Sequence, residues 1–137
     1  MNHNLEEKQA EQHSATLYLV RGLPGSGKTS FARALGIEFV EADQYFERIG
    51  KYENSLLSAA HDDCYCRAKA VLKDGSDVIV SNSSTSEPEV TRYVILAKKM
   101  EARFVSIIVE NRHSGTSIHN VPPKVVEDMR QGFAIKL

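Results

Sequence analysis

The chain has 137 residues, 42% of them apolar and 26% charged, values that predict a single soluble globular domain with a buried core. It carries 17 basic and 18 acidic residues, and the resulting formal net charge of −1 excludes a global electrostatic attraction to nucleic acid or to an anionic membrane. No apolar run reaches membrane-spanning length and no signal-peptide pattern opens the chain, so we expect a cytoplasmic protein without a membrane partner.

Composition divides the chain into two parts. Residues 1–14 (MNHNLEEKQAEQHS) are polar with one isolated leucine, and we expect them to form a flexible N-terminal tail. Residues 15–137 alternate apolar segments with polar turns and contain no internal repeat. We therefore predict one domain over 15–137, with a lid at about 111–120.

The first apolar segment, Thr16–Val20, predicts a buried strand, and the ten residues after it read RGLPGSGKTS. Gly22, Gly27, Lys28 and Thr29 match G-x-x-x-x-G-K-[ST], the P-loop pattern. Glycines allow main-chain N–H groups to turn inward around phosphate oxygens, while the lysine reaches the β and γ phosphates and the threonine hydroxyl ligates Mg²⁺. The residues expected to bind the nucleotide are Gly22, Leu23, Pro24, Gly25, Ser26, Gly27, Lys28, Thr29 and Ser30, with Thr29 as the metal ligand.

A helix should follow the P-loop through Leu35, and Ile37–Ala42 then alternates apolar and polar residues as a second strand does. Asp43 comes directly after this strand. The carboxyl end of a strand in an α/β sheet lies beside the phosphate site, so Asp43 is a candidate base or metal-shell carboxylate. The alternative interpretation is that Asp43 caps a helix beginning at Gln44.

A short helix and a turn are expected over residues 44–54, where Tyr45, Phe46 and Tyr52 either line a substrate pocket or pack in the core. Ser55 is a plausible N-cap for a long helix that ends near Lys73. Its apolar positions recur at helical spacing, which places Cys64 in the core. Two cysteines separated by a single residue, Cys64 and Cys66, suit neither a disulfide framework nor a zinc site.

The segment Asp77–Ser81 predicts a third buried strand, followed by a polar loop and a helix over about 88–100. In P-loop proteins such a strand commonly ends in the Walker-B aspartate that holds Mg²⁺, whereas here the uncharged Ser81 and Asn82 occupy the position. A fourth strand over about 102–109 ends at Glu110, a weak substitute for that aspartate because it follows a different strand.

The polar segment Asn111–Asn120 suits a lid over the phosphates. Arg112 within it is either an arginine that stabilises charge on the transferring phosphoryl group or an ordinary surface arginine. A last helix is expected over 122–137, since prolines suit a first helical turn and apolar residues follow at helical spacing.

Four alternations of strand and helix predict an α/β fold of the P-loop NTPase type. We expect a three-layer sandwich with a mostly parallel four-stranded sheet, helices on both faces and right-handed crossovers. The phosphate site would lie at the carboxyl edge of the strands.

The chain resembles the small P-loop kinases related to bacteriophage-type polynucleotide 5′-hydroxyl kinase, a group that includes small AAA-type ATP-binding proteins. The resemblance runs over about residues 16–133 and rests on the segments LVRGLPGSGKTSFAR, VEADQYF, AHDDCYCRAKAVLKDGSDVIVSN and NVPPKVVEDMRQGF. It implies that Lys28 and Thr29 hold ATP and Mg²⁺, that Asp43 acts as base toward an acceptor hydroxyl, and that Arg112 is a lid arginine.

The sequence departs from that family at three places. Phe46 stands where the polynucleotide kinases carry an arginine for the substrate phosphate. This departure argues against nucleic acid as the acceptor. Asn82 begins a turn that reads Asp-Thr-Asn-like in relatives, and Thr116 stands near the place of a second lid arginine. These two departures bear on the rate of phosphoryl transfer.

The leading hypothesis is an ATP-dependent kinase that transfers the γ-phosphoryl group to a hydroxyl of a nucleic-acid end, a nucleotide or a small molecule. Its catalytic residues would be Lys28, Asp43 and Arg112. The alternative is a degenerate nucleotide-binding switch that regulates a partner with little or no transfer. The sequence leaves open the acceptor, the choice between ATP and GTP, and the oligomeric state.

Overall fold

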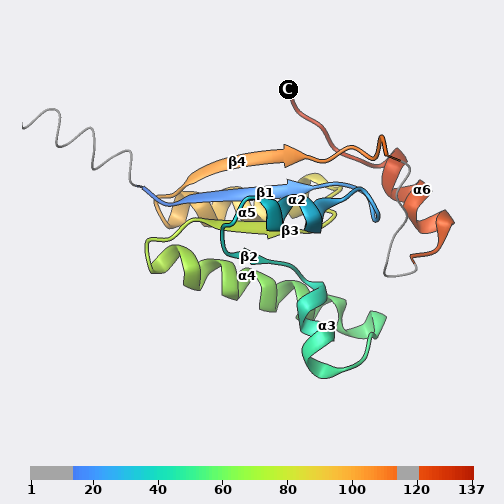
Figure 1. Ribbon diagram of the computed structural model, residues 1–137, viewed down its shortest axis with the longest axis horizontal. Helices are drawn as coiled ribbons and strands as arrows, with labels where there is room; N and C mark the ends of the chain where they lie inside the picture. The colour runs from blue at the N-terminus through green and yellow to red at the C-terminus, as the bar shows by residue number, and fades with distance from the viewer. Residues whose placement is uncertain (1–13, 114–120) are drawn as a thin grey trace, which may run out of the picture.

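The computed structural model of the protein describes residues 14–113 and 121–137. Within these residues four parallel strands form one sheet in the order β2-β3-β1-β4 (Figure 1). This is the parallel α/β sheet that the alternating sequence predicts. The strands are β1 (Thr16–Arg21), β2 (Phe39–Val40), β3 (Val78–Ser81) and β4 (Arg103–Ile108).

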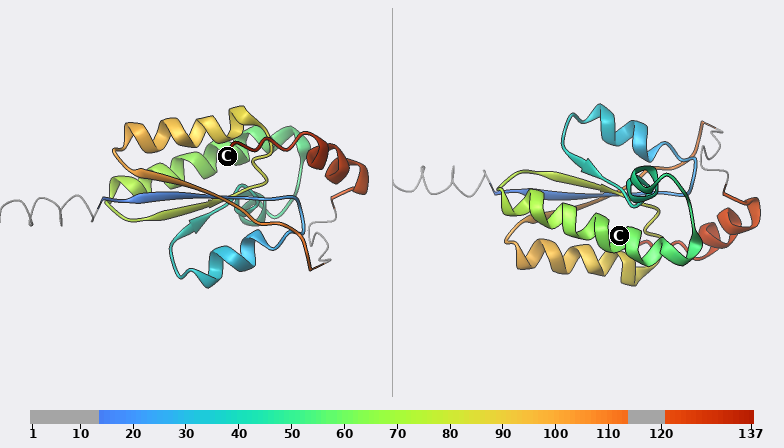
Figure 2. Two further views of the ribbon diagram at one scale, coloured as in Figure 1. Left: turned by 90° about the horizontal axis from the view of Figure 1, so that it is seen from above. Right: turned by 90° about the horizontal axis from the view of Figure 1, so that it is seen from below.

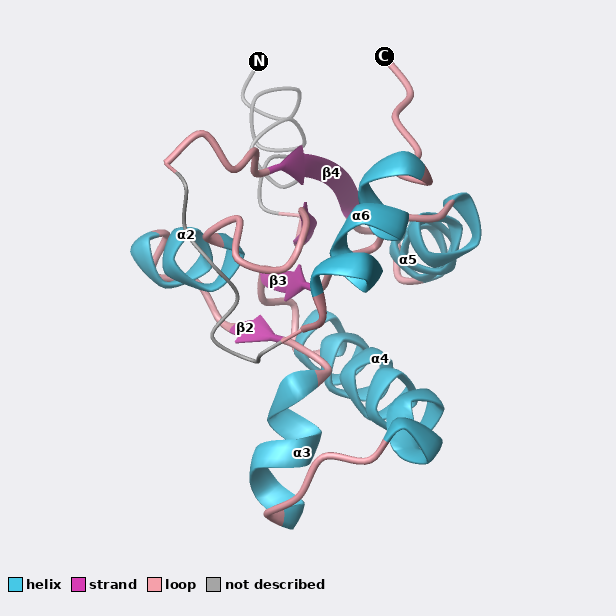
Figure 3. Cartoon of the chain, turned by 90° about the vertical axis from the view of Figure 1, so that its right-hand side faces the viewer, coloured by secondary structure: helices cyan, strands magenta, loops and turns pink. Residues whose placement is uncertain are grey.

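The register aligns the carboxyl ends of the strands at one edge of the sheet. Val20 lies opposite Ser81 of β3 and Ile107 of β4, so the residues that follow these strands emerge side by side. The chain thereby brings the P-loop, the polar loop after β3 and the segment after β4 to the same end of the molecule. Figure 3 looks onto this end, with α2 on one side of the strands and α6 on the other.

Helices cover both faces of the sheet and complete three layers (Figure 2). On one face lie α4 (Leu57–Lys73) and α5 (Glu87–Lys99), and on the other lies α2 (Lys28–Ala34). Helix α4 packs against β2 and β3 through one face, because its buried positions fall four apart along the helix, and three of these four residues are small. These buried residues of α4 are Ala60, Cys64, Ala68 and Leu72.

The region around α3 (Asp43–Ile49) differs from the sequence prediction. Strand β2 ends at Val40, and the N–H of Ala42 donates to Oδ1 of Asn82 at 2.9 Å, a side-chain bond in place of a strand ladder. Asp43 is the first residue of α3, and the preceding Ala42 provides no side-chain cap. The interpretation of Asp43 as the helix cap is therefore wrong.

Two helix ends also differ. A 3₁₀ turn, η1 (Asn54–Leu56), precedes α4, closed by the N–H of Leu56 on the carbonyl of Glu53 at 3.0 Å. Ser55 lies inside this turn, so its predicted role as N-cap is wrong. Helix α6 (Pro123–Gln131) ends six residues before the predicted end at Leu137. The chain after it bonds instead to the loop after β3, where the N–H of Ala134 donates to the carbonyl of Thr85 at 2.7 Å.

Among the helices of the described residues, none combines the length and the apolar character needed to cross a membrane. The predicted flexible tail falls almost entirely in residues 1–13, and most of the predicted lid, including Thr116, falls in residues 114–120. Both segments lie outside the described residues.

Candidate functional site

The P-loop joins β1 to α2 through a turn in which the N–H of Ser26 donates to the carbonyl of Leu23 at 3.0 Å. Gly25 and Gly27 adopt φ values of 84° and 99°. These left-handed conformations are open to glycine at little cost, and they let successive N–H groups face the same side as an anion-binding nest. The motif residues therefore have the backbone shape that phosphate binding requires.

Gly22 is required for a different reason, which is close packing. A Cβ at this position would lie 2.4 Å from the Ser26 hydroxyl oxygen and 2.7 Å from the carbonyl oxygen of Val109. Gly22 thus lets the base of the P-loop lie against the end of β4. Six of the nine predicted nucleotide-binding residues line a single cavity, namely Pro24, Gly25, Gly27, Lys28, Thr29 and Ser30.

Lys28 points back over the loop that precedes it. Its Nζ donates to the carbonyl of Leu23 at 3.0 Å. Burial lowers the pKa of Lys28 from its usual value, and the nearby carboxylates of Asp43 and Glu41 act in the opposite direction by favouring the ammonium form. The lysine is therefore held among carboxylates, at the mouth of the phosphate nest.

Thr29 meets a carboxylate that the sequence analysis did not single out. Its hydroxyl donates to Oε2 of Glu41 at 3.1 Å, and Glu41 is only 8% exposed. The alternation of residues 37–42 offered a signal, because in a strand Glu41 shares a face with the partly buried Phe39. A charged residue at a core-facing position is uncommon and marks a candidate site.

Asp43 lines the same cavity as Lys28, together with Glu41. The cavity has a volume of about 800 Å³ and extends from the P-loop across the strand ends to α6. The structure thus brings together two of the three predicted catalytic residues, Lys28 and Asp43.

The segment Glu41–Gln44, which we call the carboxylate corner, is held by residues distant in sequence. Arg67 of α4 donates through Nη2 to the carbonyl of Glu41 at 3.0 Å and through Nη1 to Oε1 of Gln44. The same Gln44 oxygen accepts the N–H of Glu41 at 3.1 Å. Arg67 Nε also donates to Asp63 at 2.9 Å, and Arg48 of α3 meets the same Asp63 oxygen at 2.5 Å. Helix α4 therefore sets the position of the carboxylates.

Asn82, at the place of the expected Walker-B aspartate, also supports the corner. It is 8% exposed, accepts the N–H of Ala42, and directs Nδ2 toward Sγ of Cys64 at 3.5 Å. Burial raises the pKa of the Cys64 thiol, which keeps it neutral in this contact. Beside Asn82, Ser81 is 3% exposed, lines the cavity, and has a hydroxyl without a hydrogen-bond partner among the described residues.

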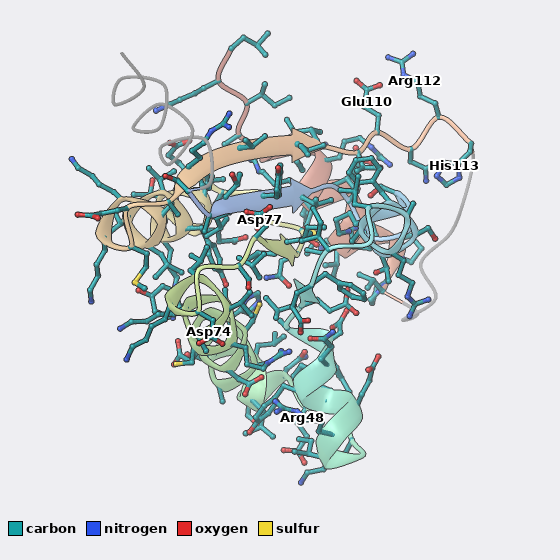
Figure 4. The ribbon with its side chains drawn as sticks, turned by 60° about the vertical axis from the view of Figure 1, so that its left-hand side comes forward. Arg48, Asp74, Asp77, Glu110, Arg112 and His113 are labelled. Atoms are coloured by element: carbon teal, nitrogen blue, oxygen red, sulfur yellow. The ribbon has the colours of Figure 1, made fainter. Side chains whose placement is uncertain are left out.

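Arg112, the third predicted catalytic residue, lies apart from the other two. Its side chain is 85% exposed and pairs with Glu110, and in Figure 4 the two side chains point together away from the body of the molecule. Neither is among the described residues that line the cavity.

The neighbours of Arg112 instead contact the P-loop. Asn111 donates to the carbonyl of Gly25 at 3.4 Å, and Nε2 of His113 lies 2.9 Å from the carbonyl of Ser26. A carbonyl oxygen only accepts, so this ring nitrogen of His113 carries the proton. His113 lines the cavity, and the segment after β4 therefore rests on the P-loop through Asn111 and His113.

The far wall of the cavity belongs to α6, which contributes Val125 and Met129. Arg21, at the end of β1, fixes the chain that leaves α6: its guanidinium donates to the carbonyls of Ser84 at 2.8 Å and Ala134 at 2.6 Å. Burial lowers the pKa of Arg21, with Glu87 and Glu89 acting in the opposite direction. The strand that leads into the P-loop thus also anchors the C-terminal segment.

Comparison with known proteins agrees with this geometry. The family model described as AAA domain matches residues 17–134. The chain belongs to this AAA domain family. Human NEDD4-binding protein 2 is 35% identical over 100 residues, which span 67% of this chain and 6% of that protein.

Solved structures share the fold at lower sequence identity. The structure of the Pnkp1/Rnl/Hen1 RNA repair complex contains a chain that matches with a TM-score of 0.67 and 18% identity, over 90% of this chain and 48% of that one. The APS kinase CysC of Mycobacterium tuberculosis matches with a TM-score of 0.54 and 14% identity, over 87% and 96%. The fold is that of the P-loop kinases. The chain spans only a small part of its curated relative and about half of the RNA repair chain.

Proposed function

We propose that the chain binds ATP with Mg²⁺ and transfers the γ-phosphoryl group to a hydroxyl group of an acceptor. The observation that carries the proposal is that Lys28 and Asp43 line one cavity, with the Thr29–Glu41 hydrogen bond on the same side. A phosphate-binding cation and a carboxylate that can receive a proton are the two groups that phosphoryl transfer to a hydroxyl requires.

The P-loop suits the phosphates of ATP. Main-chain N–H groups shaped by Gly25 and Gly27 hold the phosphate oxygens, and Lys28 exchanges the carbonyl of Leu23 for them. No described contact distinguishes adenine from guanine. The resemblance to the small P-loop kinases is what favours ATP over GTP in the proposal.

The residues beside the P-loop suit Mg²⁺. The Thr29 hydroxyl and the Glu41 carboxylate are hard oxygen donors, and Mg²⁺ in nucleotide sites is commonly held by one or two carboxylates together with substrate phosphates. The described residues contain no cluster of three or more His, Cys, Asp or Glu side chains that could hold a metal without the nucleotide. Bound here, Mg²⁺ would neutralise negative charge on the β and γ phosphates.

In the proposed reaction the acceptor hydroxyl oxygen forms a bond to the γ-phosphorus while the bond from that phosphorus to the β–γ bridging oxygen breaks, releasing ADP. Asp43 orients the hydroxyl and receives its proton. Lys28 stabilises the charge on the phosphate oxygens. Positioning and electrostatics supply most of the catalysis, since the protein forms no covalent bond to the phosphoryl group.

Arg112 has a place in this proposal only if it exchanges Glu110 for the phosphates. The variant Arg112→Ala distinguishes the two interpretations of this residue. Loss of an arginine that stabilises the transferring group costs about 10³-fold or more in kcat. An unchanged kcat would identify Arg112 as a surface residue.

The proposal is tested by following labelled γ-phosphate from ATP to a panel of 5′-hydroxyl oligonucleotides, nucleosides and small alcohols. We expect wild-type protein to label at least one class, and Asp43→Asn to reduce labelling by about 10²-fold or more while nucleotide binding persists. Nucleotide binding without labelling of any acceptor would exclude the kinase and favour the alternative, a nucleotide-binding switch.

A further inference from the structure

One part of the cavity lies outside the P-loop and α2. We call it the acceptor half and define it by Asp43 and the five lining residues named next. The loop after α3, the start of α4 and the start of α5 supply Tyr52, Leu57, His61 and Glu89 to it, and α6 supplies Met129. These residues lie across the strand ends from the phosphate nest. The charge and polarity of these residues limit which acceptors can bind beside ATP.

The acceptor half carries negative charge and lacks a strong cation. Asp43 and Glu89 both line it, and among the described residues of the cavity Lys28 of the P-loop is the sole lysine or arginine. The proposed function commits Lys28 to the nucleotide phosphates.

The arginines on the surrounding elements already have partners. Arg48 pairs with Asp63 at 2.5 Å, and Arg92 pairs with Asp62 at 2.8 Å while its guanidinium lies 4.5 Å from the centre of the Tyr65 ring. Arg21 and Arg67 are held by the main-chain carbonyls described above. An acceptor with its own phosphate would therefore find no guanidinium among the described residues that line the cavity.

The acceptor half also presents a flat apolar surface. Tyr52 lines the cavity with 61% of its area exposed, and its ring packs on Phe46 with centroids 4.6 Å apart. Phe46 is 6% exposed, so it supports Tyr52 from behind and does not face the acceptor. Leu57 and Met129 add further apolar lining. An exposed ring with a rigid backing is suited to stacking against a planar group.

From this arrangement we infer that the acceptor is a small hydroxyl compound, neutral or cationic, that places a planar group against Tyr52, as a nucleoside does, and is not a phosphate-bearing nucleic-acid end. The inference rests on the proposed function and specifies its substrate class. The cavity of about 800 Å³ takes in both the P-loop and the acceptor half, so only part of this volume is open to the acceptor.

Matched acceptors test the inference, because they differ in one phosphate and share the reacting 5′-hydroxyl. The panel contains thymidine and thymidine 3′-phosphate, adenosine and adenosine 3′-phosphate, and a 5′-hydroxyl oligothymidylate. We expect kcat/KM for each nucleoside to exceed that for its 3′-phosphate by roughly tenfold or more.

Equal or higher efficiency with the 3′-phosphates or the oligonucleotide would overturn the inference and leave the kinase standing. Labelling confined to alcohols without a planar group would also overturn it. Labelling of no acceptor in this panel or the wider one would instead overturn the proposed function.

Variants of Glu89 and Tyr52 test which residues disfavour an acceptor phosphate and which bind the planar group. Glu89→Lys should raise the relative use of thymidine 3′-phosphate over thymidine by roughly tenfold. The control Glu87→Lys makes the same charge change in the same helical turn at a residue that does not line the cavity. Tyr52→Ala should raise KM for nucleosides roughly tenfold, and Tyr52→Phe, which keeps the ring, should restore most of that loss. Equal effects of the two lysine variants, or an unchanged KM in Tyr52→Ala, would contradict the inference.

Discussion

The P-loop and the carboxylate corner face each other across one cavity but are stabilised differently. The P-loop closes on itself: Ser26 and Lys28 both bond to the carbonyl of Leu23, within five residues along the chain. The corner is held by residues distant in sequence. Asn82 bonds to Ala42, 40 positions away along the chain, and Arg67 bonds to Glu41, 26 positions away. The backbone turn of the P-loop is thus closed by neighbouring residues, with further contacts from Asn111 and His113, whereas the corner depends on the packing of α3 and α4.

This difference separates two kinds of mutation. A change in the P-loop removes a group that contacts phosphate, whereas a change on α4 acts on the carboxylates through their support. Phosphate binding by the P-loop should therefore be separable from the two proposed functions of the corner, Mg²⁺ binding and acceptor activation, since Arg67 and Asn82 hold the corner and are not part of the P-loop. Substitutions on each side test the separation.

The largest effect is expected from Lys28→Ala. Removal of the ammonium should lower nucleotide affinity, and the rate of transfer should fall by roughly 10²–10³-fold, the range for loss of one preorganised electrostatic contact. The fold should persist, because among the described residues the side chain hydrogen-bonds to the nearby Leu23 carbonyl alone. Calorimetric titration with ATP and the labelled-transfer assay measure the two effects.

The control for Lys28→Ala is Arg33→Ala, which removes a cation from an exposed position on the same helix. It should leave nucleotide affinity unchanged. Wild-type affinity in Lys28→Ala would show that the P-loop assignment is wrong.

Glu41→Gln should have the next largest effect, on the Mg²⁺ dependence of binding. The enhancement of ATP affinity by Mg²⁺ should fall by roughly 10–100-fold, because the substitution replaces the charged carboxylate of one of the two proposed ligands with a neutral amide. Affinity without Mg²⁺ should not fall, since the variant also removes a negative charge near the phosphates. ATP titrations with and without Mg²⁺ measure the Mg²⁺ enhancement and the Mg²⁺-free affinity separately.

Glu38→Gln provides the matched control for Glu41→Gln, because Glu38 is an exposed glutamate just before β2. An unchanged Mg²⁺ enhancement in Glu41→Gln would remove Glu41 from the proposed metal site.

The same contrast explains which parts of the site were predictable. The P-loop and the strand before it were recognisable because their geometry follows from adjacent residues, such as Gly25 and Gly27. The side-chain bond from Ala42 to Asn82 and the short β2 depend on contacts 40 residues apart, which no local pattern records. Glu41 was missed for that reason, although the register of its strand offered a signal.

The segment after β4 shows a second limit of local reasoning. A polar loop with an arginine suited a lid, but which side chain faces the phosphates depends on how the backbone leaves the sheet. In the structure His113 reaches the P-loop, and Arg112 pairs with Glu110 on the opposite side (Figure 4).

Arg67→Ala tests whether α4 controls the corner. It removes the bonds to Glu41, Gln44 and Asp63, and we expect the free energy of unfolding to fall by about 1–2 kcal/mol. The rate of transfer should fall while ATP affinity measured without Mg²⁺ stays near the wild-type value. Urea denaturation and ATP titration measure the two quantities, and Arg67→Lys should restore part of the stability. An equal loss of Mg²⁺-free ATP affinity and transfer rate would contradict the separation of the two halves.

The smallest expected effect is the pH dependence that Lys28 imposes. Burial lowers the pKa of Lys28 below its usual value of 10.5, which the residue retains in the unfolded chain. Between the two pKa values the unfolded chain binds more protons than the native protein, so the stability contributed by this residue rises with pH in that window. Relative to Lys28→Met, the nucleotide-free wild type should therefore become more stable as the pH rises toward 10.5. ATP affinity should change in the opposite direction, because the neutral amine attracts phosphate less strongly. Denaturation and ATP titration at pH 7 and at alkaline pH measure the two trends, and parallel trends in Lys28→Met would exclude Lys28 as their source.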